Sequence, residues 1–367
     1  MKKSFSSRDE QFMRTAVALA DRVKGSTVPN PAVGAVVVAD DAVVGRGATA
    51  PAGGPHAERT ALKKAGRRAR EATLYVTLEP CCHRGRTPPC VEAIIRSGIR
   101  RVVAAGRDPN PLVHGKGFAL LRKHGIEVDV GLLRTEAAAI NEDFFWSVRH
   151  GRTWVSLKLA MTLDGKIADS QGKSKWISGT RSRVFVHNLR RRHAAIAVGR
   201  GTLLADDPRL TVRHVEGVSP ARFVFSSTDS IPPSSRFVRT ARQVRSVIVV
   251  GGGRARTRTR RKDGVEVWAT GEKSRAKRLG VAMEMAFEEG IPSMFVEGGR
   301  ELAAGFLECR MVNRLYLFYG NKILGAGLSG LGPVTGPAID RALKLRNITF
   351  RQLGEDMLVS GIPDWKL

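Results

Sequence analysis

Cysteine is scarce in this sequence, with four residues in a chain of 367. So few thiols exclude the disulfide framework of a small secreted domain and favour a reducing compartment. No apolar run approaches the roughly 20 residues that a membrane-spanning helix needs. The basic N-terminal residues are not followed by the apolar segment of a signal peptide. We therefore expect a cytoplasmic protein that does not associate with membranes.

Acidic residues are also in short supply, since 34 Asp and Glu face 61 Lys and Arg, giving a net charge of +27. An excess of this kind is one sign of nucleic-acid binding. However, the densest basic run, residues 254–262, contains no aromatic side chain on which a base would stack. We interpret this run as a solvated loop. A generally basic surface also suits a phosphorylated substrate and a phosphate-rich cofactor, so nucleic acid is the less favoured partner.

Two of the cysteines complete a motif of zinc enzymes. His56-Ala57-Glu58 is followed by Pro80-Cys81 and then by Cys90. One imidazole and two thiolates fill three corners of a zinc tetrahedron and leave the fourth for water, whose pKa zinc lowers to about 7. Glu58 is not a ligand in this pattern and moves the proton of that water. The motif is typical of deaminases that hydrolyse an exocyclic amine from a nucleobase-like ring.

The spacing within this motif leaves an alternative open. Eight residues separate Cys81 from Cys90, whereas the common form has two. A histidine at a helix start and two buried thiols with no metal would give the same sequence. Adjacent side chains on an extended backbone point apart, so we expect Cys82 to be a small buried residue rather than a ligand.

Alternating strand and helix patterns predict two α/β domains, residues 1–150 and 151–367. We expect Asp9 to cap the first helix. Helices that open at the zinc motif would place ligands where the helix dipole favours thiolates. The predicted helices of the first half span residues 9–24, 56–64 and 90–95, and its strands span 33–38, 42–47, 73–78, 101–106 and 126–130. Residues 142–152 form the predicted seam between the halves, a helix followed by His150-Gly151-Arg152. In the second half we expect a helix over 180–192 and strands over 154–160, 194–199, 244–250 and 294–296.

Glycine turns follow three predicted strands of the second half, at residues 199–201, 251–253 and 298–299. Such turns let backbone N–H groups approach a phosphate at a helix N-terminus. None has the Gly-x-Gly-x-x-Gly fingerprint, but together they favour a nucleotide site. Arginines are abundant and no acidic residue is evidently placed to hold a ribose 2′-hydroxyl, which favours NADP over NAD.

Several longer blocks of the sequence occur in a fixed order that is shared with a known family. These blocks are residues 27–31, 56–58, 80–90, 108–111, 140–145, 157–166, 174–178, 203–211 and 296–299. Together they resemble the bifunctional riboflavin-biosynthesis deaminase–reductase family. The resemblance covers nearly the whole chain and includes the wide Cys81–Cys90 spacing. It implies an N-terminal cytidine-deaminase-like α/β/α domain followed by a dihydrofolate-reductase-like α/β domain.

The resemblance implies two consecutive reactions. The first half, with one zinc ion per chain, would deaminate 2,5-diamino-6-ribosylamino-4(3H)-pyrimidinone 5′-phosphate. The second half would use NADPH to reduce the ribosyl group, giving 5-amino-6-(5-phosphoribitylamino)uracil. The expected partner is thus a phosphorylated pyrimidine, and we expect a homo-oligomer.

The resemblance also implies roles for individual residues. Zinc ligation falls to His56, Cys81 and Cys90, and proton shuttling falls to Glu58. The implied substrate residues of the deaminase are Asn30, His83, Arg86, Asp108 and Asn110. Those of the reductase are Ser174, Arg190, Leu210, Arg213 and Glu297. The implied cofactor residues are Ala160, Trp176, Thr202, Asp206, Ser227, Gly299, Arg300, Glu301, Leu302, Ala303, Ala304 and Gly305.

Several of these assignments have alternatives. The block around Ser227 departs from the usual family pattern. Trp176 could instead be an ordinary core aromatic residue, and Arg190 could instead lie at a solvated helix end. For the whole chain, one rival is a zinc deaminase of nucleosides or RNA whose second half is a binding module. A second rival is a structural zinc protein. It needs a closed site with four ligands, and it assigns no function to Glu58.

Overall fold

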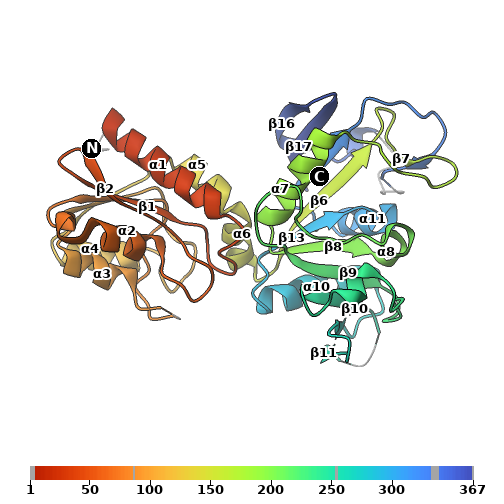
Figure 1. Cartoon of the computed structure of the whole chain (residues 1–367), viewed down its shortest axis with the longest axis horizontal. Helices are drawn as coiled ribbons and strands as arrows, with labels where there is room; N and C mark the ends of the chain where they lie inside the picture. The colour runs from red at the N-terminus through yellow and green to blue at the C-terminus, as the bar shows by residue number, and fades with distance from the viewer. Residues whose placement is uncertain (1–4, 86, 253–254, 332–338, 366–367) are drawn as a thin grey trace. The chain divides into compact units, whose positions relative to one another are not determined.

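The protein folds into two compact units, Met1–Gly151 and Arg152–Leu367, in the computed structural model (Figure 1). The structure describes residues 5–85, 87–252, 255–331 and 339–365. Arg86, one of the expected substrate residues, lies outside the described residues. Within those residues, no helix has both the length and the apolar character that crossing a membrane requires.

The first unit is built on a five-stranded sheet in the order β2-β1-β3-β4-β5. Strand β1 is antiparallel to β2 and β3, while β3, β4 and β5 are parallel. The strands are β1 (Gly34–Ala39), β2 (Ala42–Ala48), β3 (Thr73–Val76), β4 (Arg101–Ala104) and β5 (Glu127–Val130). The helices are α1 (Ser7–Val23), α2 (Ala57–Ala65), α3 (Cys90–Ser97), α4 (Lys116–Lys123), α5 (Arg134–Ile140) and α6 (Glu142–His150), with a 3₁₀ turn, η1, at Gly66–Ala69.

Helices cover both faces of this sheet. Because side chains alternate along a strand, Ala35 and Val37 of β1 join the core formed with α2, α3 and α4. Val36 and Val38 point the other way and join the core formed with α1 and α5. The unit is therefore a three-layer α/β/α sandwich.

Helix α2 lies in direct contact with strand β2. A Cβ atom on Gly45 would lie 2.2 Å from the Ala61 carbonyl oxygen, and one on Gly47 would lie 2.1 Å from that of Ala57. Real Cβ atoms do not approach backbone oxygens so closely, so both positions require glycine. This contact fixes the start of α2, where the zinc motif begins.

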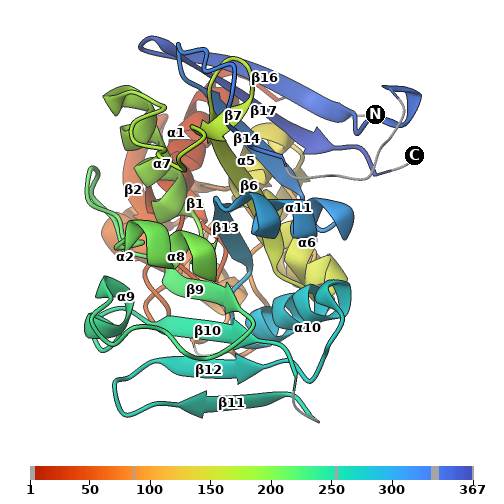
Figure 2. The same ribbon diagram turned by 90° about the vertical axis from the view of Figure 1, so that its right-hand side faces the viewer.

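The second unit contains a ten-stranded sheet in the order β11-β12-β10-β9-β8-β13-β6-β14-β17-β16. Its seven strands from β12 to β14 are parallel, and the edges are antiparallel. Figure 2 shows strands β9, β10, β12 and β11 side by side. A separate two-stranded sheet pairs β7 with β15.

The strands of this unit have the following bounds: β6 (Trp154–Met161), β7 (Lys166–Ala168), β8 (Ala195–Gly199), β9 (Ala221–Ser226), β10 (Ser246–Val250), β11 (Thr257–Arg260), β12 (Glu266–Ala269), β13 (Ser293–Glu297), β14 (Arg314–Tyr319), β15 (Leu328–Ser329), β16 (Leu345–Leu353) and β17 (Asp356–Pro363). The helices are α7 (Thr180–Arg192), α8 (Arg200–Asp206), α9 (Arg236–Arg239), α10 (Arg275–Glu288) and α11 (Arg300–Glu308), with a 3₁₀ turn, η2, at Ile339–Arg341.

The prediction of a solvated loop for the basic run is wrong, because the run contains the edge strand β11 (Thr257–Arg260). This strand pairs with β12. Arg258 donates to Glu288 of α10 at 2.7 Å, and Arg260 donates to Glu266 of β12 at 3.0 Å. The ion pairs hold the exposed strand against its neighbours, so these arginines are engaged within the fold.

The cap of the first helix also differs from the prediction. Ser6 is the N-cap, and Asp9 occupies the third helical position of a capping box. The Asp9 carboxylate also accepts hydrogen bonds from the Tyr75 hydroxyl at 2.7 Å and from Arg101 Nη1 at 2.8 Å. Burial opposes the charge, but the hydrogen bonds from Tyr75, Ser6 and Arg101 lower the pKa of Asp9 to about 2. Asp9 thus joins α1 to strands β3 and β4.

We expect Asp9→Asn to destabilise the first unit by about 2–3 kcal/mol, because it removes an ionised acceptor from a buried network. Since folding lowers the pKa of Asp9 from its ordinary 3.8 to about 2, its contribution is complete above pH 4 and is lost as the pH falls toward 2. Urea melts at pH 7 and pH 3 should therefore differ less for the variant than for the parent. Asp41→Asn is the matched control, because Asp41 forms an exposed pair with Arg8. Equal effects of the two substitutions would contradict this role of Asp9.

Candidate active sites

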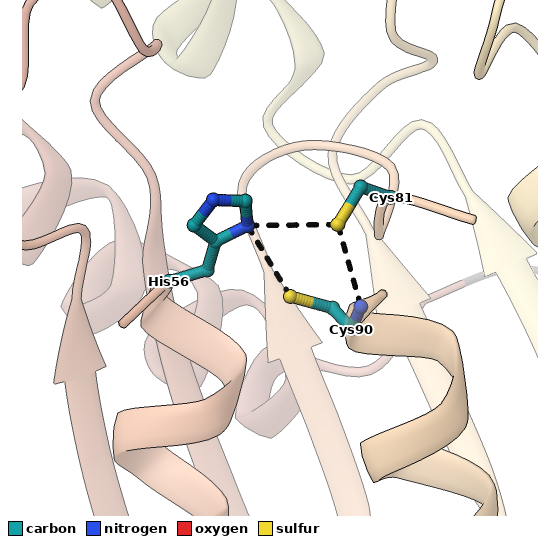
Figure 3. Close-up of side chains that lie close together, drawn as sticks. All are labelled: His56, Cys81 and Cys90. Atoms are coloured by element: carbon teal, nitrogen blue, oxygen red, sulfur yellow. Dashed lines mark hydrogen bonds between the residues drawn. The ribbon is translucent and has the colours of Figure 1, made fainter. Parts of the chain in front are cut away.

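Three side chains of the first unit converge at the starts of two helices (Figure 3). His56 is the N-cap of α2, Cys90 is the first residue of α3, and Cys81 lies in the segment after β3. The Nδ1 atom of His56 lies 3.5 Å from Cys81 Sγ and 3.4 Å from Cys90 Sγ. The ligand atoms of all three residues lie within 4.8 Å of one another.

This triad has the dimensions of a zinc site. With Zn–S bonds of about 2.3 Å and Zn–N bonds of about 2.0–2.1 Å, tetrahedral geometry places sulfur and nitrogen about 3.6 Å apart. The observed separations of 3.4 and 3.5 Å fit that value. A hydrogen bond from Cys90 lowers the pKa of the Cys81 thiol to about 4, which favours the thiolate that binds metals. The other nitrogen of His56, Nε2, lies 3.3 Å from Thr87 Oγ1, which fixes the ring orientation.

The triad is open rather than closed. Across the described part of the chain, no fourth His, Cys, Asp or Glu joins the cluster. The Sγ atom of Cys82 lies 3.7 Å from the Leu112 carbonyl oxygen, and Cys82 is half-buried, outside the cluster. Three protein ligands with a free fourth position are the pattern of a catalytic zinc site, whereas structural sites carry four.

Glu58 lies in the first turn of α2, two residues after His56. Only 4% of its surface is exposed, and this burial raises the pKa of its carboxyl group to about 7. A carboxyl group with a pKa near neutrality can both accept and donate a proton. Glu79 is the other acidic residue of the motif region. Its carboxylate accepts three backbone N–H groups, so it is not free to carry a proton in the same way.

Two expected substrate residues, His83 and Asp108, carry signs of a ligand pocket. The Nδ1 atom of His83 is buried and has no hydrogen-bond partner within the described residues. Burial, together with the charges of Glu79 and Cys81, raises the pKa of Asp108 to about 6. Asp108 Oδ1 accepts the backbone N–H of Asn110 at 2.8 Å. The arrangement leaves buried polar groups that a heterocycle would satisfy.

Asn30 lies in the loop between α1 and β1, and a residue that sequence reasoning missed holds this loop. The buried amide of Asn141 accepts the N–H of Ala32 at 2.9 Å and donates to the Ala32 carbonyl at 2.8 Å. The only sequence signal for this role was that Asn141 belongs to one of the family blocks. Its partner, Ala32, lies 109 positions away in the chain, so the contact was not predicted.

In the second unit, expected cofactor residues gather at one edge of the sheet. Strands β9, β8, β13 and β6 are neighbours and parallel. Ser227 follows β9, and the Gly199–Thr202 segment ends β8 and opens α8. Gly298 and Gly299 follow β13, and Ala160 lies near the end of β6. The carboxyl edge of a parallel sheet is where α/β proteins bind nucleotides.

The turn after β13 requires glycine. Gly298 has a φ of 76° and Gly299 a φ of 77°. A Cβ atom on Gly299 would also lie 2.8 Å from Thr202 Oγ1, so this turn lies against α8. The residues at positions 302–305 are buried in the core, so these four positions would meet a phosphate only through their backbone. Arg300 is half-buried and Glu301 is exposed.

Arg190 and Glu297, two expected substrate residues, bind each other. Arg190 donates to both carboxylate oxygens of Glu297, at 2.5 and 3.0 Å, and also to the Thr211 carbonyl at 3.1 Å. The side chain of Arg190 is 13% exposed, so it is not a solvated helix end. Lys158 of β6 is in register with Glu297, and burial lowers its pKa. Sequence reasoning did not single out Lys158, although a lysine between two leucines of a buried strand was a signal.

Leu210 and Arg213 lie in the loop between α8 and β9. The Leu210 side chain is 2% exposed and packs in the core, so any contact with a ligand would come from its backbone. The φ of Leu210 is 52°, in the left-handed region. Arg213 is exposed, and its backbone N–H donates to Nδ1 of His187 at 3.0 Å.

Trp176 is not a core aromatic, because 63% of its surface is exposed. The Arg183 guanidinium lies 4.7 Å from the centre of its ring. The preceding residue, Lys175, forms an ion pair with Asp206 at 3.1 Å, which ties the segment between β7 and α7 to the end of α8. Ser174 is half-buried in the same segment.

Comparisons with known proteins identify both units. Residues 6–106 match the cytidine and deoxycytidylate deaminase zinc-binding region, and residues 153–359 match the RibD C-terminal domain. Riboflavin biosynthesis protein RibD of Aquifex aeolicus (strain VF5) is 43% identical over 352 residues, covering 96% of this chain and 97% of the relative. The RibD protein of Escherichia coli (strain K12) is 37% identical over 362 residues, covering 94% and 96%.

Solved structures give the same result over nearly the whole chain. Acinetobacter baumannii RibD, form 1, has a TM-score of 0.87 at 33% identity and covers 97% of this chain and 99% of its own. A diaminohydroxyphosphoribosylaminopyrimidine deaminase/5-amino-6-(5-phosphoribosylamino)uracil reductase from Thermotoga maritima has a TM-score of 0.82 at 36% identity, with the same coverage.

These matches confirm the predicted fold class, a cytidine-deaminase domain followed by a dihydrofolate-reductase-like domain. They also confirm the zinc-binding deaminase site at His56, Cys81 and Cys90, and the reductase domain implies a nicotinamide cofactor. The chain belongs to the RibD family, the bifunctional deaminase–reductases of riboflavin biosynthesis.

Proposed function

We propose that the first unit deaminates 2,5-diamino-6-ribosylamino-4(3H)-pyrimidinone 5′-phosphate and that the second unit reduces the ribosyl group of the deaminated product with NADPH. The observation that carries this proposal is the open zinc triad beside the buried carboxyl group of Glu58. The relative from Thermotoga maritima, whose name states both of these activities, supports it at 36% identity.

In the deaminase unit, His56, Cys81 and Cys90 would hold zinc, which supplies a water acidic enough to be deprotonated at neutral pH. Glu58 takes up that proton at its carboxylate and delivers it to the ring, and it then carries the second proton of the water to the departing amine. The overall reaction exchanges an amino group for a carbonyl oxygen and releases ammonia. His83 and Asp108 orient the pyrimidine, since both present buried polar atoms with capacity left for a ligand.

In the reductase unit, the cofactor supplies a hydride. The Gly298-Gly299 turn and the first N–H groups of α11 hold its phosphate. The abundance of arginine, with no acidic residue evidently placed to hold a ribose 2′-hydroxyl, favours NADPH over NADH. Burial opposes the charge of Glu297, but Arg190 and Lys158 lower its pKa, so it stays a carboxylate. As a carboxylate it accepts hydrogen bonds from the hydroxyl groups of the sugar.

We also propose a cytoplasmic homo-oligomer. Thiolate ligands for zinc suit a reducing compartment. The outermost strand of the ten-stranded sheet, β16, exposes 71% of Phe350 and 47% of Ile348. An exposed edge strand with apolar side chains is a surface that a second copy would cover.

A coupled assay tests the proposed function directly. The zinc-loaded chain should release ammonia from the diaminopyrimidine and then oxidise NADPH. Cys81→Ser should abolish zinc binding and ammonia release, because a serine hydroxyl is a poor zinc ligand. NADPH oxidation with previously deaminated substrate should survive, since the ligands all lie in the first unit. Cys309→Ser is the matched control and should keep both activities. A parent chain without NADPH turnover would favour a nucleoside or RNA deaminase instead.

Glu58→Gln should retain zinc but lose deamination by about 10²–10⁴-fold, because the amide is unable to accept a proton. The measurements are zinc content and the rate of ammonia release under saturating substrate. The control is Glu10→Gln, which lies in α1 and pairs with Arg14 on the surface. Activity of the Glu58 variant within about tenfold of the parent would exclude Glu58 as the shuttle.

Gly299→Val should raise the KM for NADPH by about tenfold or more, because a side chain obstructs the turn and strains a φ of 77°. Ammonia release should not change. Gly290→Val is the control, since Gly290 has a φ of 74° but precedes β13 at its amino end. Thermal melts with and without NADPH separate binding from stability. If the Gly299 variant melts lower yet gains the full NADPH-induced shift of the parent, the turn does not hold phosphate.

A further inference from the structure

Glu79 is a buried carboxylate two residues before the zinc ligand Cys81, and 3% of its surface is exposed. Its Oε2 atom accepts the backbone N–H groups of Gly115 at 2.9 Å and Asp108 at 3.3 Å. Its Oε1 atom accepts the N–H of Phe118 at 3.3 Å. Three backbone donors thus satisfy the carboxylate, and two of them belong to the start of helix α4, where a negative charge is stabilised.

A second contact holds α4 to the same segment. A Cβ atom on Gly117 would lie 2.3 Å from the Pro80 carbonyl oxygen and 3.2 Å from Glu79 Oε1. The helix therefore begins directly on the Glu79-Pro80 backbone, and only glycine fits there. The backbone N–H of Glu79 also donates to the Gly106 carbonyl at 3.0 Å.

These contacts hold both ends of a loop that carries proposed substrate residues. Residues 107–115 connect β4 to α4 and include Asp108 and Asn110. Glu79 binds this loop at Asp108 near its beginning and at Gly115 at its end. Within the loop, the Asp108 carboxylate accepts the Asn110 N–H, and the Asp108 carbonyl lies 2.8 Å from His114 Nδ1. One carboxylate therefore fixes both ends of the loop relative to the strand segment that leads to Cys81.

We propose that Glu79 is a positioning residue of the deaminase site, which holds loop 107–115 in place relative to the zinc ligands without touching substrate or metal. The inference rests on the proposed substrate roles of Asp108 and Asn110. It differs from a purely structural role, in which Glu79 stabilises α4 and its loss does not change the KM for the substrate.

The test is Glu79→Gln in the full-length, zinc-loaded chain. The amide keeps the shape but turns one oxygen into a donor, so at least one backbone N–H faces another donor. At least one of the amides of Gly115 and Phe118, whichever faces the new NH2 group, should exchange hydrogen roughly tenfold to a hundredfold faster, as the loss of a charge-assisted hydrogen bond implies. The KM for the diaminopyrimidine should rise by about tenfold or more, with a smaller change in kcat and with zinc content unchanged.

The matched control is Asp9→Asn, which also removes a buried carboxylate from a hydrogen-bonded network of the first unit. Asp9 packs with α1 on the face of the sheet opposite to α2, α3 and α4. It should lower the melting temperature without raising the KM. A second variant, Gly117→Ala, leaves the carboxylate in place but pushes the start of α4 away from Pro80. It should raise the KM in the same way, with zinc retained.

Each result decides the inference. Faster exchange with a raised KM in the Glu79 and Gly117 variants, and not in the Asp9 variant, supports it. A parental KM despite faster exchange, an equal KM increase in Asp9→Asn, or loss of zinc from Glu79→Gln overturns it. If the parent chain releases no ammonia from the diaminopyrimidine, the proposed substrate is wrong. Unchanged hydrogen exchange at both Gly115 and Phe118 rejects the positioning role whatever the substrate is.

Discussion

The deaminase site depends on how closely helix α2 approaches strand β2. Gly45 and Gly47 allow the helix backbone to touch the strand, because a Cβ atom at either position would overlap a carbonyl oxygen. The helix start carries both His56 and Glu58, so this contact sets where one ligand and the proton carrier lie. Cys90 opens the neighbouring helix α3, and both helices pack on the same face of the sheet. The zinc triad is thus a consequence of helix-on-sheet packing.

The reductase unit builds its site by a different route. Its parallel strands end at a common edge, and turns after three neighbouring strands bring glycines and short polar side chains together. Charged groups at this edge are already paired: Arg190 binds Glu297 in the interior, and Lys175 binds Asp206 at the surface. The preorganised pairs keep ionised groups in place before a ligand arrives, which lowers the ordering cost of binding.

Sequence reasoning succeeded where chemistry or periodicity is local. The zinc ligands follow from residue type and order, and the five strands of the first unit follow from their apolar patterns. In the second unit, core strands β9 and β14 and helix α10 were not predicted. Sequence reasoning failed where the partner is distant in the chain. Asn141 holds Ala32 across 109 positions, and the basic strand β11 is ordered by glutamates of α10 and β12. Family membership and the zinc site are confirmed, whereas the individual substrate and NADPH residues stay predictions. A sequence does not distinguish a side chain that binds a ligand from one that packs in the core. Leu210, an expected substrate residue whose side chain is buried, illustrates this.

The two units have separate hydrophobic cores. Among the described residues, each core cluster draws its members from one side of the Gly151–Arg152 boundary only. A substitution that repacks one core therefore leaves the packing of the other unchanged. In evolutionary terms the two cores are separate modules, so we expect substitutions that repack one of them to accumulate independently of the residues that fill the other.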